Sequence, residues 1–159
     1  MGDGGNGASA IPIYHMFIDQ TIKLNPKYMI FIVPARWLNG GRGLDDFRQE
    51  MLEASKIRVL HDYFDSKECF NGVEIKGGIC FFLWERNYKG DCEVYTHNQG
   101  NILHSKRPLL EKGAEIFIRS AEQVSLFHKI MSFGETSMES WLNAGRYFGF
   151  HTKVEWDNM

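Results

Sequence analysis

The chain has 159 residues and a mass of 18.4 kDa, a size that predicts one domain able to bury about 70% of the surface of its unfolded chain. Hydrophobic residues make up 43% of the sequence and charged residues 24%, which excludes a wholly disordered chain. The net charge is −2 and the pI about 6.3, so proteins that hold nucleic acid by a generally basic surface are also excluded. Any contact with DNA must depend on a local patch.

The cysteines indicate neither a disulfide framework nor a zinc site, because Cys69, Cys80 and Cys92 are odd in number and lack ligand spacing. Cys80 lies in an apolar run and is predicted to be a buried thiol. The sequence contains no signal peptide and no apolar stretch of about 20 residues that would span a bilayer. We therefore expect a cytoplasmic location and no membrane partner.

The first predicted element is an amphipathic helix that follows a glycine-rich start. Residues 1–9 are expected to be flexible, with Ser9 as the helix N-cap. Apolar residues at helical spacing continue the helix to about Leu24, and Asn25-Pro26 ends it. The continuous apolar run Tyr28–Val33 then predicts a strand that is covered on both faces.

A glycine-rich loop separates this strand from a second helix, predicted over residues 45–54 with Asp45 and Asp46 in its first turn. The backbone amides of Gly40–Gly43 could hold a phosphate at the start of that helix. The loop lacks both the dinucleotide fingerprint and the P-loop lysine. A plain strand-to-helix turn is therefore the favoured interpretation.

Two more strands are predicted, over residues 57–64 and 78–85. The second of these contains Ile79–Trp84 without polar alternation, so we expect it to lie in the centre of the three strands. This order leaves the strand at residues 28–33 at an open edge. An exposed apolar edge needs a neighbouring strand or a second copy of the chain to cover it.

The remaining chain, residues 91–159, is predicted to be a mixed α+β extension continuous with a partial α/β domain over residues 10–90. A capping-box pattern at Ser120–Gln123 begins its most regular helix. The predicted elements of the extension are short strands at 91–96 and 115–118, helices at 121–131 and 137–143, and an aromatic loop at 145–153.

The apolar strand Ile79–Trp84 also carries the most informative aromatic residues. Phe82 and Trp84 share one face of the strand, whereas Phe81 and Leu83 point the other way. Near a cleft, Phe82 and Trp84 could stack a flipped-out base, and the alternative is that they pack under a helix.

Conventional catalytic or metal-binding patterns are weak. Cys69 is the one thiol outside an apolar strand, and nothing near it in sequence would lower its pKa. The six histidines show no ligand-like spacing, and His61 and His128 are interpreted as structural. Asp62 and Asp65 have no second carboxylate placed to form an acid–base pair, so no catalytic residue and no metal ligand is predicted.

Three segments carry a resemblance to a known family: Gly4–Tyr14, Phe31–Arg48 and Gly72–Trp84, with a weaker echo in residues 146–152. On these segments the chain resembles the latter half of an adenine-specific DNA methyltransferase of type II restriction–modification systems, closest to fused methylase–endonuclease polypeptides. The resemblance implies an α/β fold, the C-terminal half of a Rossmann-like sheet. Its expected order is helix, strand, helix and two further strands with a reversed last hairpin, followed by the mixed extension.

In that family a glycine-rich loop binds S-adenosylmethionine, and an Asn-Pro-Pro-Tyr motif holds the target adenine. This sequence contains neither motif, so the resemblance implies S-adenosylmethionine in the complete enzyme and no activity or cofactor binding for this chain alone. It also implies Phe82 or Trp84 as the second aromatic residue that contacts the base. Arg36, Arg42 and Lys76 would be cations near the DNA.

The expected partners are DNA and either a missing N-terminal methyltransferase half or a second copy that pairs with the open edge. Two alternatives remain open. One is a non-catalytic module that binds DNA or a protein through the loop arginines and the aromatic residues. The other is a structural remnant that dimerises through residues 28–33.

Overall fold

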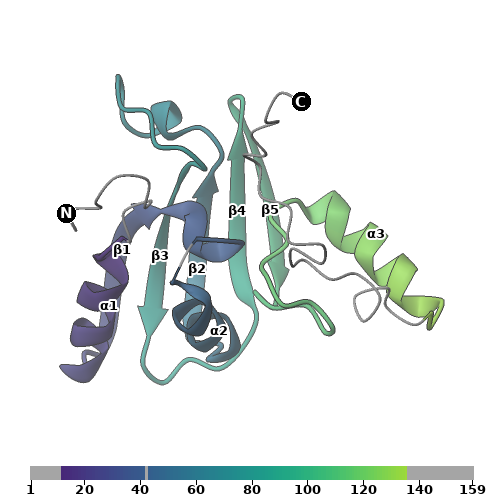
Figure 1. Cartoon of the computed structure of the whole chain (residues 1–159), viewed down its shortest axis with the longest axis horizontal. Coiled ribbons are helices and arrows are strands. Elements are labelled where there is room, and N and C mark those ends of the chain that lie inside the picture. Colours follow the sequence, from purple (N-terminus) through teal and green to yellow (C-terminus); the bar gives the residue numbers. More distant parts are fainter. Residues whose placement is uncertain (1–11, 42, 136–159) are drawn as a thin grey trace, which may run out of the picture.

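The computed structural model describes residues 12–41 and 43–135 and forms a five-stranded mixed sheet with the strand order β1-β3-β2-β4-β5 (Figure 1). The strands are β1 Tyr28–Pro34, β2 Ile57–Tyr63, β3 Ile79–Glu85, β4 Cys92–Asn98 and β5 Asn101–Arg107. The helices are α1 Tyr14–Lys23, α2 Asp45–Glu53 and α3 Ala121–Ser132, with short 3-10 turns η1 Ala35–Leu38 and η2 Ser66–Glu68. None of the helices in the described ranges has the length and apolar character that crossing a bilayer requires.

The strand directions bring three carboxyl ends to one edge of the sheet. β3 lies antiparallel between β1 and β2, so the predicted order of these strands, with β1 at an edge, is confirmed. β4 pairs parallel with β2, and β5 returns antiparallel along β4. The carboxyl ends of β1, β2 and β4 therefore meet at the top of Figure 1.

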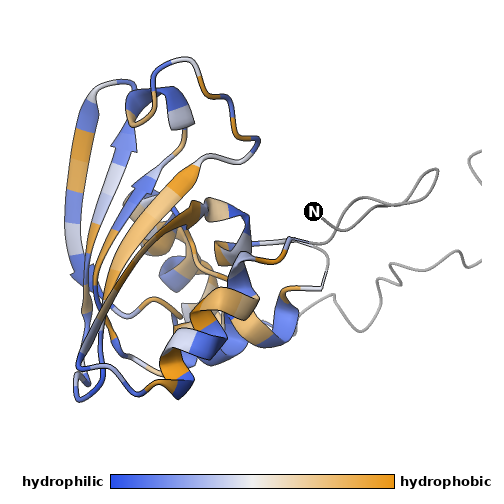
Figure 2. Cartoon of the chain, turned by 90° about the vertical axis from the view of Figure 1, so that its left-hand side faces the viewer, coloured by the Kyte–Doolittle hydropathy of each residue, from blue (hydrophilic) through white to orange (hydrophobic). Residues whose placement is uncertain are grey.

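The core lies between the sheet and the two helices α1 and α2, which cover the same side of it (Figure 2). Leu44 and the inward face of α2 are buried as the spacing of their apolar residues predicts. The side chains that meet in this layer include Ile18, Phe47, Met51, Leu52, Met29, Val33, Leu60, Cys80, Phe82, Trp84 and Val94. Their removal from water is the main favourable contribution to folding.

β1 is not covered on both faces, and that prediction is wrong. Met29 and Val33 are buried against the helices, but Tyr28, Ile30 and Ile32 on the other face are 49%, 67% and 53% exposed. A continuous apolar run therefore fails to distinguish a strand with two covered faces from an edge strand with one.

The sheet face opposite α1 and α2 carries a row of stacked rings from four neighbouring strands. His61 lies between Phe81 and Tyr95, with ring centroids 4.3 and 4.5 Å away, and Tyr95 stacks on His104 at 4.6 Å. The strand register places these residues directly opposite one another. Because neighbouring rings cover one another's faces, this row offers mainly ring edges to solvent.

The extension after residue 90 continues the same sheet. β4 and α3 confirm the strand predicted at 91–96 and the helix predicted at 121–131, whereas β5 was not predicted. The strand predicted at 115–118 is wrong, because this segment is irregular and is held by a bond from the Phe117 N–H to the Leu38 carbonyl (2.9 Å). The prediction that Ser9 caps the first helix is wrong, because α1 begins at Tyr14 with Ile13 at the N-cap position. The flexibility predicted for residues 1–9 and the predictions for 137–143 and 145–153 lie outside the described residues.

Candidate functional site

The edge formed by the carboxyl ends of β1, β2 and β4 gathers two of the predicted DNA-contacting cations. Arg36 in η1 and Lys76 in the loop after β2 are both exposed. Their loops touch, since a Cβ atom added at Gly77 would lie 3.0 Å from the Arg36 Cγ. Arg42, the third predicted cation, lies outside the described residues.

The two aromatic residues predicted to stack a base are part of the core. Phe82 is fully buried, with Phe31 at 6.4 Å and Trp37 at 6.0 Å between ring centroids, and Trp84 is 3% exposed. The prediction that Phe82 and Trp84 share a face is confirmed, but α1 and α2 cover that face. Neither ring presents a face that a base could reach without opening the core, which corrects the base-stacking interpretation of these two residues.

An exposed aromatic ring that the sequence reasoning missed lies in the loop after β2. Phe70 is 40% exposed and follows η2. The hydroxyl of Ser66 organises this loop, because its Oγ donates to the Val73 carbonyl and accepts from the Ile75 N–H, both at 2.8 Å. The available signal was an aromatic residue in the mainly polar loop segment 65–76, between two strands.

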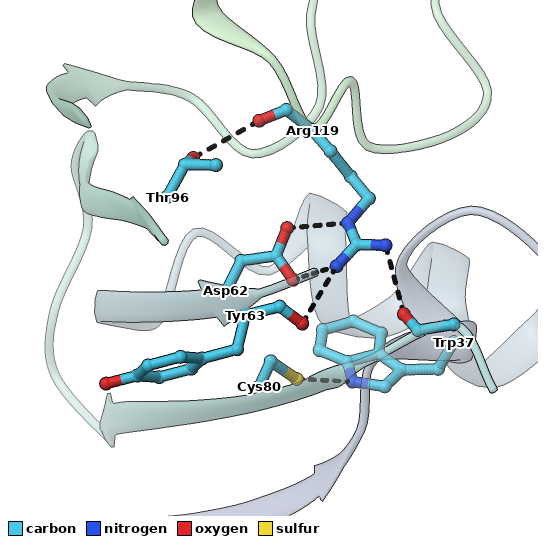
Figure 3. A network of polar contacts seen from close by, with 7 residues as sticks. Trp37, Asp62, Tyr63, Cys80, Thr96 and Arg119 are labelled. Atoms are coloured by element: carbon cyan, nitrogen blue, oxygen red, sulfur yellow. Dashed lines mark hydrogen bonds and ion pairs between the residues drawn. The ribbon is translucent and has the colours of Figure 1, made fainter. Parts of the chain in front are cut away.

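A buried ion pair anchors the extension to this edge (Figure 3). Arg119 donates through Nε and Nη2 to the two carboxylate oxygens of Asp62, at 2.6 and 2.5 Å. Burial raises the pKa of the Asp62 carboxyl, and the hydrogen bonds and charge of Arg119 oppose that rise. The same guanidinium donates to the carbonyls of Gly77 (3.0 Å) and Tyr63 (3.4 Å). The pair therefore fixes the turn next to Lys76, and the guanidinium occupies both carboxylate oxygens of Asp62.

The turn before β3 depends on glycine. Gly78 has φ +80°, and a Cβ atom there would lie 2.0 Å from the Tyr63 carbonyl oxygen. Two residues after Gly78, the sulfur of Cys80 accepts a hydrogen bond from Trp37 Nε1 at 3.3 Å. Burial raises the pKa of this thiol to about 12. Cys80 is thus the buried core thiol that the sequence predicts.

Two histidines far apart in sequence meet on the open face of the sheet. His61 Nδ1 lies 2.9 Å from His97 Nε2, so one ring donates to the other. Burial lowers the pKa of both, and the neighbouring His97 lowers that of His61 further, whereas Glu68 and Asp62 oppose the shift at His97. In the part of the chain that the structure describes, no group of three His, Cys, Asp or Glu side chains could hold a metal ion.

The glycine-rich loop packs against the helix that follows it. Gly41 has φ +103°, and a Cβ atom there would lie 2.7 Å from Leu44 Cδ1. Arg48 Nη1 donates to the Gly40 carbonyl at 3.2 Å. These contacts, at Gly40 and Gly41, agree with a plain strand-to-helix turn.

Comparison with known proteins gives a family match and a curated relative. The family model described as Eco57I restriction-modification methylase matches residues 2–70. A protein described as an uncharacterized adenine-specific methylase of Mycoplasma pneumoniae is 34% identical over 149 residues, which cover 87% of this chain and 35% of that protein. The chain thus spans about a third of the length of this curated relative.

Among solved structures, the methyltransferase subunit of a type I restriction-modification system from Streptococcus thermophilus is similar over 69% of this chain and 21% of that chain. The two share 15% sequence identity and a TM-score of 0.34. The family match and the curated relative support a relationship between this chain and the DNA methyltransferases.

Proposed function

We propose that this chain is part of an adenine-specific DNA methyltransferase of restriction–modification, of the type II fused methylase–endonuclease kind. The observation that carries the proposal is the 34% identity, over 149 residues, to a protein described as an adenine-specific methylase. The match of residues 2–70 to the methylase family supports the same reaction class. The antiparallel insertion of β3 between β1 and β2 is consistent with the reversed hairpin that the resemblance implies.

Within such an enzyme, this chain supplies a surface that faces the DNA. Arg36 and Lys76, with Arg42 by its place in the sequence, neutralise phosphates at the carboxyl edge of the sheet. Phe70 takes the base-stacking role first assigned to Phe82 or Trp84, because its ring is exposed at this edge.

The methyl donor belongs to the complete enzyme. When bound, S-adenosylmethionine supplies an electrophilic methyl group, which must be held in line with the amino group of the adenine. The sequence lacks the donor loop and the Asn-Pro-Pro-Tyr motif, and Gly41 of the glycine-rich loop packs against Leu44. We therefore assign no donor-binding residue to this chain and expect no turnover from it alone.

Among residues 12–41 and 43–135, no strand pairs with the outer edge of β1, which supports an extended sheet in the complete protein. Tyr28, Ile30 and Ile32 expose apolar surface beside this edge, a combination that promotes association. We expect another segment of the methyltransferase to cover these three side chains. The alternative is that another copy of this chain covers them. If the second copy covers them, Ile30→Lys with Ile32→Lys will convert a dimer to a monomer in sedimentation.

A DNA-binding titration tests the surface assigned here. Arg36→Ala and Lys76→Ala should each weaken binding about equally for all sequences and lower the slope of log affinity against log salt by about one. Lys89→Ala is the matched control, because Lys89 is exposed beyond the far end of β3. Unchanged affinity and slope in both variants, or no binding by the parent chain at low salt, would remove this surface from the proposal.

A further inference from the structure

A hollow lies beside the hairpin that joins β4 to β5. Its volume is about 380 Å³, within the range of small-ligand sites. Polar side chains line it, including Asn98, Gln99, Asn101 and Glu122, together with the apolar side chains Phe64, Ile102 and Leu103. The hollow opens at the same carboxyl edge of the sheet as the loop that carries Phe70.

The geometry of the hairpin holds this hollow in place. Gln99 and Gly100 form its two-residue turn with φ +51° and +76°. The Gln99 N–H donates to the Glu68 carboxylate at 2.8 Å, which ties the tip of the hairpin to η2. On the other side, Thr96 Oγ1 donates to the carbonyl of Arg119 at 3.2 Å. The hairpin is therefore joined to the loop after β2 through Glu68, and to the segment before α3 through Arg119.

The lining favours a base edge over a phosphate. Glu122 is the one charged side chain among the described lining residues, so none of these lining side chains carries the positive charge that holds a phosphate. Within residues 12–41 and 43–135, the side-chain amides of Asn98, Gln99 and Asn101 form no hydrogen bond with another group. A carboxamide is both donor and acceptor, and it matches the N6 and N7 atoms of adenine in a bidentate pair.

We propose that this hollow binds an adenine base of DNA outside the reaction centre, so that the β4–β5 hairpin contributes to the choice of DNA sequence. One carboxamide, from Asn98 or Asn101, pairs with the N6–N7 edge, and the carboxylate of Glu122 accepts from the exocyclic amino group. The inference that the ligand is an adenine base follows from the lining residues. The inference that this base belongs to DNA rests on the proposed function. Thymine offers an acceptor in place of the amino group and is disfavoured at this edge.

The test is a titration of the folded chain, with ¹⁵N spectra of the side-chain amides as the readout. Deoxyadenosine monophosphate should shift the signals of Asn98, Gln99 and Asn101 with a dissociation constant of about 1 mM, and thymidine monophosphate should bind at least about fivefold more weakly. The double variant Asn98→Ala with Asn101→Ala should lose at least about fivefold in affinity for the adenine nucleotide. Asn87→Ala, in an exposed turn after β3, is the matched control and should bind as the parent does.

Equal binding of the two nucleotides, or no shift of these amide signals, would overturn the proposal. Tighter binding of S-adenosylhomocysteine than of the adenine nucleotide would also overturn it, because the hollow would then take the adenosyl group of a cofactor. Methyl transfer by the complete enzyme is a separate readout. If the complete enzyme methylates DNA adenine but the hollow prefers no base, only the inference about the hollow fails. If the hollow selects adenine but the complete enzyme does not methylate DNA, the proposed function fails.

Discussion

Removal of the Arg119 guanidinium is expected to destabilise the fold strongly, because the Asp62 carboxylate would stay buried without a counter-charge. In Arg119→Ala this fully buried carboxylate loses two hydrogen bonds, of 2.6 and 2.5 Å, and the Gly77 carbonyl loses its donor. Loss of one partner from a buried ion pair costs about 3–5 kcal/mol. We expect the free energy of unfolding near pH 7 to fall by about that amount, measured by urea denaturation with the fluorescence of buried Trp37 and Trp84.

The loss should shrink as the pH is lowered. Burial raises the pKa of the Asp62 carboxyl, and without Arg119 its main opposing charge is gone. The folded variant then binds this proton more tightly than its unfolded chain does, so its free energy of unfolding rises, relative to the parent, as the pH falls toward the raised pKa. The difference between variant and parent should therefore be smaller near pH 5 than near pH 7.

Two control variants make this prediction specific. Asp62→Leu combined with Arg119→Leu should lose less stability than Arg119→Ala, because no charge is then left buried. Arg58→Ala breaks an exposed ion pair with Glu85, of 3.1 Å, and should cost less than about 1 kcal/mol. A loss below about 1 kcal/mol in Arg119→Ala, or a loss independent of pH, would refute the assignment of the pair as an anchor of this edge.

Gly78→Ala should cost at least about 3 kcal/mol in urea denaturation, because the new Cβ would lie 2.0 Å from the Tyr63 carbonyl oxygen. The control is Gly72→Ala, where φ is +78° but no atom lies within 4 Å of the added Cβ, so the expected cost is only about 1–2 kcal/mol. Equal losses of stability in the two variants would contradict the close contact between Gly78 and the Tyr63 carbonyl oxygen. Because the pKa values of His61 and His97 are lowered, these two side chains bind fewer protons in the folded chain than in the unfolded one. Stability that is fully present above the unfolded pKa of about 6.5 is therefore lost as the pH falls from there through the lowered folded pKa values. The double variant His61→Phe with His97→Phe should flatten this part of the stability curve, and an unchanged curve would show that the histidine pair does not cause it.

The helices and strands whose own side chains form a clear apolar pattern could be predicted from the sequence. The strands around Ile57 and Ile79 and the helix that begins at Asp45 follow from apolar runs, apolar spacing and the acidic first turn. β5 was missed because its seven residues mix polar and apolar side chains, most of which are exposed, and pairing with β4 decides its structure. The segment around Phe117 looked like a strand, but its backbone bonds to η1 instead of a sheet.

The site was harder to predict than the fold, because it depends on contacts between distant residues. Arg36 and Lys76, taken from the family resemblance, are exposed at the edge of the sheet as loop residues usually are, and their contact with DNA stays a prediction. The ion pair of Asp62 and Arg119 joins positions 57 apart and has no signature in their spacing. Phe82 was misassigned because it lies on the face of β3 that α1 and α2 cover, whereas Phe70 lies in a loop and is exposed.

Transfer of a labelled methyl group from S-adenosylmethionine to the N6 atom of DNA adenine tests most directly whether this chain is the DNA-facing part of a methyltransferase. The chain would be assayed alone and joined to a segment that carries the donor loop and the Asn-Pro-Pro-Tyr motif. We expect turnover only from the joined polypeptide, with a loss of about tenfold in Phe70→Ala and none in Val73→Ala, an exposed position of the same loop. Turnover by the chain alone, or none by the joined polypeptide, would contradict this account.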